Sequence, residues 1–156
     1  MAHATRHRPA TCWVEAAPFR AHVRHLCATT GLPWPVLAMR AGVSLALVDH
    51  LLHGREGRTP RRITRTCAAR LLAVTQAGVS ALAVEGVHAD AATRLAGVLQ
   101  RRGWSAAEVA DAADIPPGVV QGLLDGVLPR VTVLDELRLR ALVAASDRGL
   151  VLQAAA

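Results

Sequence analysis

The chain of 156 residues contains no lysine and no tyrosine, and its aromatic residues are three tryptophans and one phenylalanine. With so few aromatic side chains the core must be built from Leu, Val and Ala, which favours helices over a sheet. All 18 cationic residues are arginine. Two explanations stay open: a GC-rich coding sequence, which would also account for the excess of alanine, and selection for bidentate contacts with phosphate and guanine.

Cysteines are also few: Cys12, Cys27 and Cys67 are odd in number and widely spaced, with no C-x-x-C pair. This pattern argues against a disulfide framework and against a thiolate metal site, and it predicts a reducing cytoplasm. Long apolar runs are missing as well, because polar residues interrupt the longest one, residues 71–87. We therefore expect neither a signal peptide nor a membrane span.

A pattern of apolar and small residues occurs twice, 72 positions apart. In residues 34–53 it supplies the apolar contacts, the small crossing residue and the turn glycine, Gly42, that two crossing helices require. The residues identical between the copies all belong to this framework: Gly31/Gly103, Ala38/Ala110, Ala41/Ala113, Val48/Val120, Leu51/Leu123, Leu52/Leu124 and Gly54/Gly126. The sequence therefore predicts an all-α chain with two tandem helix-turn-helix domains of four to five helices each.

Charged residues are distributed unevenly between the two copies. Residues 1–78 hold 11 arginines against three acidic residues, whereas residues 79–156 hold seven against nine. We expect a basic N-terminal arm at residues 1–17, a DNA-binding helix-turn-helix domain at 18–78, and a related domain for dimerisation or interaction at 79–156. Only the first copy has the electrostatics of a polyanion binder.

Helix starts are marked by short polar residues and by proline. Pro18 suits the first turn of a first helix, the second helix is expected at 33–42 and the third up to Gly54. A short helix is expected within the connector, at 80–85. The residues expected to cap further helices are Ser44, Thr64, Asp90, Ser105 (with Glu108) and Asp135.

The third helix of such a unit enters the major groove and reads base edges with its outward face. In the first copy the outward residues, and hence the expected base-reading set, are Ser44, Leu45, Ala46, Asp49, His50 and His53. Ser44 and His50 could hydrogen-bond bases, but phosphate would repel Asp49 unless it meets a cytosine amino group, so base specificity is expected to be modest.

Phosphate contacts are better supplied, by arginines at the end of the second helix and in a loop at 55–65. The expected phosphate-binding residues are Arg40, Arg55, Arg58, Arg61, Arg62 and Arg65. Six such contacts would give a log–log salt slope of roughly −5. The alternative is a solvated, partly disordered loop. Arg6 and Arg8 of the arm are candidates for the minor groove, with a simple disordered tail as the alternative.

The sequence gives little indication of a metal site or of a catalytic site. The pairs His22/His25 and His50/His53 have i, i+3 spacing, which places both imidazoles on one helix face, but no clustered carboxylate or cysteine completes a ligand set. We expect no metal and no cofactor. An enzyme is not expected either, because no nucleophile with a base, no carboxylate pair and no phosphate loop occurs.

The second copy departs from what a groove reader requires. Asp114 replaces the turn glycine, which is tolerated because Asp adopts left-handed geometry. The residues expected to face outward on its third helix include no cation: Pro116, Pro117, Gly118, Gln121, Gly122 and Asp125. A flat face of this kind suits packing on another protein surface, and Leu128, Val131 and Val133 are expected to extend it.

The stretch GLPWPVLAMRAGVSLALVDHLLHG, followed by RRITRTCAARLLAV, resembles lambda-repressor-like (Xre-type) helix-turn-helix proteins of actinobacterial or phage type with an Arg-rich loop before the last helix. The resemblance covers residues 19–75 well and 90–146 more weakly. It implies a four- or five-helix domain that binds operator DNA, often as a dimer, with its base-reading positions at the third-helix residues named above.

Together these observations predict a cytoplasmic, nucleoid-associated regulator of transcription, such as a repressor, that binds double-stranded DNA as a homodimer and has no membrane contact. Two alternatives stay open. One is an architectural DNA-binding protein of low sequence specificity, and the other is an interaction adapter that contacts transcription machinery through residues 79–156.

Overall fold

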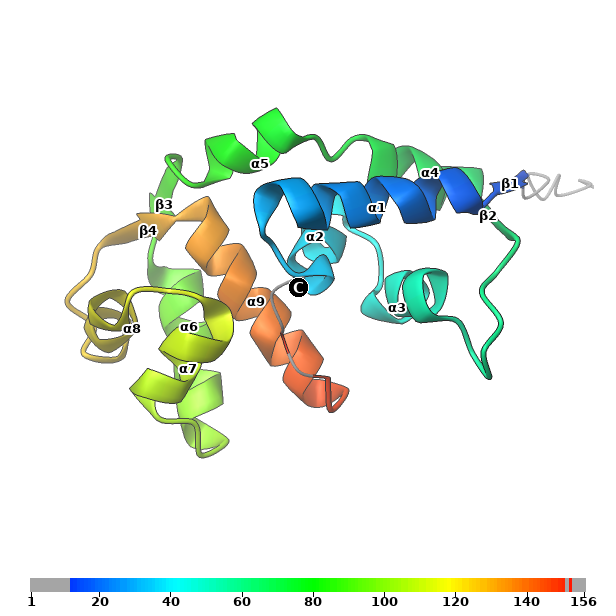
Figure 1. Cartoon of the computed structure of the whole chain (residues 1–156). Coiled ribbons are helices and arrows are strands. Elements are labelled where there is room, and N and C mark those ends of the chain that lie inside the picture. Colours follow the sequence, from blue (N-terminus) through cyan, green and yellow to red (C-terminus); the bar gives the residue numbers. More distant parts are fainter. Residues whose placement is uncertain (1–11, 151, 153–156) are drawn as a thin grey trace, which may run out of the picture.

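The computed structural model describes residues 12–150 and residue 152, most of which are helical (Figure 1). The first half contains, in chain order, β1 (Trp13–Glu15), α1 (Ala17–Thr30), α2 (Trp34–Ala41), α3 (Leu45–His53), β2 (Arg62–Thr64) and α4 (Arg65–Leu72). After α5 (Gln76–Leu82) the second half contains β3 (Gly86–His88), α6 (Asp90–Arg101), α7 (Ala106–Ala113), α8 (Pro117–Leu124), β4 (Arg130–Thr132) and α9 (Val133–Asp147). Each half thus has the same order of elements: a strand, three helices, a strand and a helix.

The mostly helical fold class is confirmed, but the structure also contains short strands that the sequence analysis did not predict. β1 pairs antiparallel with β2, with Val14 opposite Ile63, and β3 pairs in the same way with β4, with Val87 opposite Val131. A three-residue strand shows too little alternation to be told from a loop in the sequence. Each small sheet joins the start of the first helix to the start of the last helix of its half.

One cluster of buried apolar side chains extends through both halves. Helix α9 runs through the centre of the molecule (Figure 1), where it packs against α6 of its own half and against α2 of the first half. The apolar framework residues of both copies are buried as expected: Leu37, Ala38, Ala41, Val43, Val48 and Leu51, and Val109, Ala110, Ala113, Ile115, Val120 and Leu123.

Three of the expected helix caps are confirmed. The side chains of Ser44, Thr64 and Ser105 accept hydrogen bonds from the backbone three residues on, at 3.3, 3.3 and 3.2 Å. Asp135 does not cap α9, because Thr132 at the end of β4 accepts from the Asp135 backbone at 3.0 Å. Asp90 is the first residue of α6 rather than its cap.

The connecting helix also differs from the expected range of 80–85. Thr75 accepts a hydrogen bond from the Gly78 backbone at 3.1 Å and thereby starts α5 at Gln76. Buried Val79 and Leu82 hold this helix on the core. None of the described helices is long and apolar enough to cross a lipid bilayer.

Candidate nucleic-acid interface

The turn between α2 and α3 is formed by residues with the required backbone geometry. Gly42 ends α2 in the left-handed conformation, with φ of 65°, and its amide bonds to the carbonyls of Ala38 and Met39. Val43 is buried and Ser44 then caps α3. The two helices are thus joined by three residues, residues 42–44, with the predicted turn glycine at the first and the predicted cap at the last.

The expected base-reading residues of α3 differ in exposure. Ser44 and His53 are exposed, whereas Ala46, Asp49 and His50 are half-buried. Nδ1 of His53 lies 2.8 Å from Oδ1 of Asp49, and the His53 ring meets Trp34 edge-on with centroids 6.1 Å apart. Asp49 is therefore engaged by a neighbouring imidazole, and the face offers polar groups mainly at its two ends.

Leu45 does not face outward, and that prediction was wrong. Its side chain is only 5 % exposed and belongs to the common core. Leu45 begins α3 directly after the turn from α2, and α2 packs against both α3 and α9. The apolar pattern of α3 alone does not show which of its sides the core covers.

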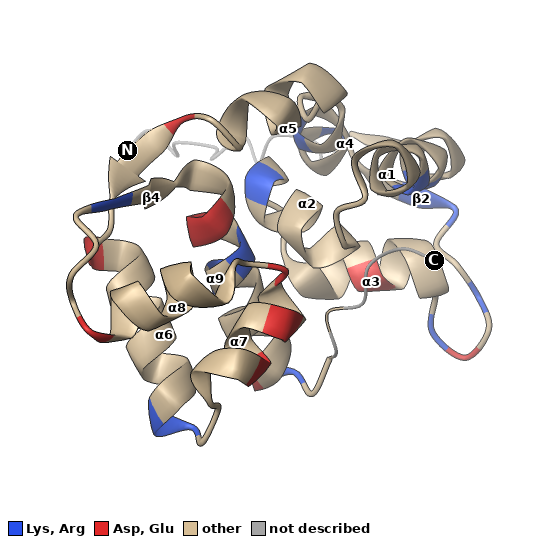
Figure 2. Ribbon diagram, turned by 60° about the vertical axis from the view of Figure 1, so that its left-hand side comes forward, with Lys and Arg blue, Asp and Glu red and all other residues tan. Residues whose placement is uncertain are grey.

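The expected phosphate-binding residues, Arg40, Arg55, Arg58, Arg61, Arg62 and Arg65, are all exposed. The loop after α3 turns sharply, since Arg55 and Arg58 exchange backbone hydrogen bonds of 3.0 and 2.9 Å around Glu56 and Gly57. Figure 2 shows the blue arginines of this loop and of β2 beside the end of α3.

This loop ends earlier than the expected range of 55–65. Arg62 lies in β2 and Arg65 is the first residue of α4, because pairing with β1 makes residues 62–64 extended. Arg62 lies 3.9 Å from Glu15 across this sheet, with 63 % of the arginine side chain exposed. Among the described residues, no carboxylate forms an ion pair with Arg40, Arg55, Arg58, Arg61 or Arg65. Arg6 and Arg8 lie outside the described residues.

Three further arginines of the first half bind backbone carbonyls, and the sequence analysis did not identify this role. Arg20 and Arg24 of α1 donate to carbonyls at the end of α3, and Arg70 of α4 donates to the Gly42 carbonyl at 3.0 Å. The only signal in the sequence is the i, i+4 spacing of Arg20 and Arg24 on one face of a helix. Their partners lie about thirty positions away, which no local pattern reveals.

The outward face of α8 has no cation, as expected. Gly122 is an exception to the predicted exposure: it is buried, and a Cβ built on it would come within 2.8 Å of Leu128 Cγ. Leu128 thus covers α8 rather than extending an open surface, and Val131 is buried within β4.

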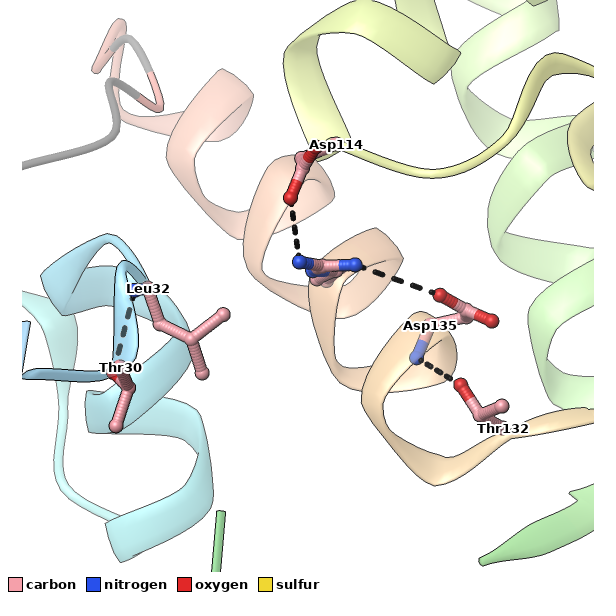
Figure 3. Close-up of polar contacts among 6 residues, drawn as sticks. Thr30, Leu32, Asp114, Thr132 and Asp135 are labelled. Atoms are coloured by element: carbon pink, nitrogen blue, oxygen red, sulfur yellow. Dashed lines mark hydrogen bonds and ion pairs between the residues drawn. The ribbon is translucent and has the colours of Figure 1, made fainter. Parts of the chain in front are cut away.

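The turn before α8 is held by an arginine of α9. Asp114 adopts φ of 54°, and its carboxylate accepts from Arg138 at 2.6 Å, while Asp135 lies 3.8 Å from the same guanidinium (Figure 3). Acidic residues are conspicuous on α7 in Figure 2, on the side of the molecule away from the arginine loop. The charge division seen in the sequence is thus also a division in space.

His22, one of the paired histidines, contacts the backbone, and Cys27 is buried. Nε2 of His22 lies 3.1 Å from the Val74 carbonyl. Burial raises the pKa of the Cys27 thiol, which disfavours its reactive thiolate form. Within the part of the chain that the structure describes, no three His, Cys, Asp or Glu side chains gather to hold a metal ion.

No family model, curated protein or solved structure matches this chain significantly.

Proposed function

We propose that the protein is a regulator of transcription that binds double-stranded DNA in the cytoplasm, on the nucleoid. Helix α3 enters the major groove, and the exposed arginines around its C-terminal end contact phosphates on either side. The observation that carries this proposal is the set of arginines without a carboxylate partner beside α3, among the described residues. Free guanidinium groups at this place match the backbone contacts that give most of the affinity for DNA.

The proposal includes two tandem helix-turn-helix domains with different tasks. It is supported by the repeated order of elements and by the left-handed turn residues Gly42 and Asp114 at equivalent positions. Since α8 offers no cation, the second domain serves dimerisation or sets the geometry of the first. The resemblance to lambda-repressor-like proteins agrees with this assignment of roles.

An architectural role with low sequence specificity is the second candidate, and a specific observation favours it. On α3 the base-reading face is narrow, because Leu45 is buried and Asp49 is engaged by His53. A recognition helix with so few free polar groups would depend on phosphate contacts, which carry no sequence information.

Duplex binding measured by fluorescence anisotropy at several salt concentrations tests both candidates. We plot the logarithm of the binding constant against the logarithm of the salt concentration and expect a slope of about −5 for six phosphate contacts. Changing Arg61, Arg62 and Arg65 to Ala should make this slope less steep by about 3. The matched control changes three exposed arginines of the second half, Arg94, Arg101 and Arg148, and should leave the slope nearly unchanged.

Three outcomes separate the functions. Tighter binding to duplexes selected from a random library than to unselected ones supports the regulator. Equal affinity for both supports the architectural protein. Absence of any salt-dependent duplex binding by the folded chain overturns both and leaves the interaction adapter.

A further inference from the structure

Two arginines of α1 bind the C-terminal end of α3. Nε of Arg20 donates to the Leu51 carbonyl at 2.7 Å, and Nη2 of Arg24 donates to the Leu52 carbonyl at 3.2 Å. The last carbonyls of a helix have no partner within it and carry partial negative charge. The two guanidinium groups supply the missing hydrogen bonds and a positive charge, so these side chains cap α3 from a neighbouring helix.

Arg20 also binds the far end of the arginine loop. Its Nη2 donates to the Pro60 carbonyl at 3.0 Å while its Nε holds Leu51. One planar, rigid guanidinium therefore joins the residues before and after the loop that carries Arg55 and Arg58. This single side chain therefore ties both ends of the loop to α1, beside the pairing of β1 and β2.

The second half lacks this arrangement. The bonds from the Ala16 amide to the Arg61 carbonyl and from the Ala89 amide to the Pro129 carbonyl are equivalent in the two halves, at 2.8 and 3.1 Å. Counted from these alanines, Arg20 and Arg24 correspond to Thr93 and Gly97.

At the place of the Arg20 and Arg24 guanidinium groups, the second half has an open cavity of about 440 Å³. Thr93 and Gly97 of α6 line it, together with Leu123 and Leu124 at the end of α8. Arg94 and Arg101 of α6 also line this cavity, but neither is recorded donating to a carbonyl of α8, as Arg20 and Arg24 do to α3. There the helix end is satisfied by the backbone, since the Gly126 amide donates to the Leu123 carbonyl at 3.1 Å. The arginine cap is thus found in the half that carries the arginine loop, and its equivalent is missing from the half without one.

We propose that Arg20, assisted by Arg24, is a positioning residue that holds the arginine loop in the geometry required to contact DNA phosphates, without itself binding phosphate. The inference rests on the proposed function, because it assigns the residue that shapes the proposed DNA-binding surface. Arg20 is only half exposed and donates to two carbonyls, whereas Arg55 and Arg58 are exposed and their guanidinium groups make no described hydrogen bond.

A double-mutant cycle on the full chain tests this role. Arg20→Met keeps the apolar stem of the side chain and removes the guanidinium, and it is made both in the natural chain and in a chain with Arg55→Gln and Arg58→Gln. We expect Arg20→Met to weaken duplex affinity about tenfold in the natural chain, and less than about twofold when the loop arginines are already gone. Arg94→Met on α6 is the matched control and should have no effect in either background.

Amide hydrogen exchange of the free protein gives a second readout that does not depend on DNA. Arg20→Met should speed exchange of the Arg55 and Arg58 amides at least about fivefold while the amides of α6–α8 keep their rates. If Arg20→Met does not fold, Arg20→Lys replaces it in the same cycle, since a single ammonium cannot reproduce the paired geometry of the guanidinium.

Equal losses of affinity in both backgrounds would overturn the proposal, because Arg20 would then contact DNA independently of the loop. Unchanged exchange at Arg55 and Arg58 would overturn it as well. A natural chain that binds no duplex refutes the proposed function alone, and the exchange rates then still decide whether Arg20 holds the loop.

Discussion

Gly54 shows how one residue shapes the candidate interface. It follows α3 with φ of 77° and ψ of −173°, a backbone region that essentially only glycine adopts. A Cβ at this position would lie 2.5 Å from the Arg58 carbonyl oxygen and 2.9 Å from the Thr59 amide nitrogen. The absence of a side chain therefore lets the arginine loop fold back against the helix end.

We predict that Gly54→Ala lowers the free energy of unfolding by about 3 kcal/mol, because both backbone strain and a clash with backbone atoms oppose the new methyl group. Gly126→Ala is the control: its φ of 67° is also left-handed, but nothing lies within 4 Å of the added Cβ. That change should cost about 1 kcal/mol. Chemical denaturation followed by circular dichroism measures both, and equal losses would contradict the role assigned to the close contact at Gly54.

Several helices, including α3, α4 and α7, begin at a serine or threonine that caps them, and α7 has the most complete cap. The Ser105 hydroxyl accepts from the Glu108 backbone, and the Glu108 carboxylate accepts in return from the Ser105 amide at 2.7 Å and from its hydroxyl at 2.7 Å. The bond from the Ser105 amide, followed by that from its hydroxyl, lowers the pKa of Glu108 below its ordinary 4.5. The capping box therefore stabilises α7 most when Glu108 is ionised.

This pKa shift gives stability a defined dependence on pH. Because the pKa of Glu108 is lower in the folded state, its contribution is present above pH 4.5 and is lost as the pH falls through the folded-state value. We predict that the natural chain is more stable than Glu108→Gln near pH 7 and that this difference shrinks as the pH falls below 4.5. Denaturant titrations across this range measure it, with Asp111→Asn on the same helix as control. A difference that stays constant with pH would refute the assignment.

At the scale of the whole molecule, the two halves share one core. Helix α9 of the second half packs on α2 of the first, which is the helix that positions α3. Five of the eight residues of α2 are buried, so this helix has core on most sides rather than on one face. The geometry of the candidate interface is therefore supported by residues almost a hundred positions further along the chain.

We predict that Leu139→Ala in α9, where the leucine is fully buried, lowers the free energy of unfolding by about 2 to 5 kcal/mol. Since the core is continuous, amide exchange should become faster in α2 as well as in α6, and unfolding should remain a single transition. Arg148→Ala, an exposed change just after α9, should have little effect. Faster exchange confined to the second half would show that the halves unfold independently.

Most of the fold was predictable from local patterns, and the exceptions have specific causes. Apolar periodicity located the framework of both copies, and Ser44, Thr64 and Ser105 marked helix starts correctly. Leu45 was misassigned because its burial depends on the common core. The four strands of the described residues were missed because three residues carry too little periodicity, and Thr132 at the end of β4 is the cap that was expected at Asp135.

The sequence predicted which residues belong to the candidate site but not which contacts hold them in place. The sequence by itself determined where the arginines concentrate, which helix follows the turn at Gly42, and that α8 lacks cations, because these properties belong to residues close together in the chain. Only the tertiary structure decided that Arg20 joins Leu51 to Pro60 and that α9 supports α2. Such contacts join residues tens of positions apart, and the packing of the whole chain, rather than any local propensity, selects them.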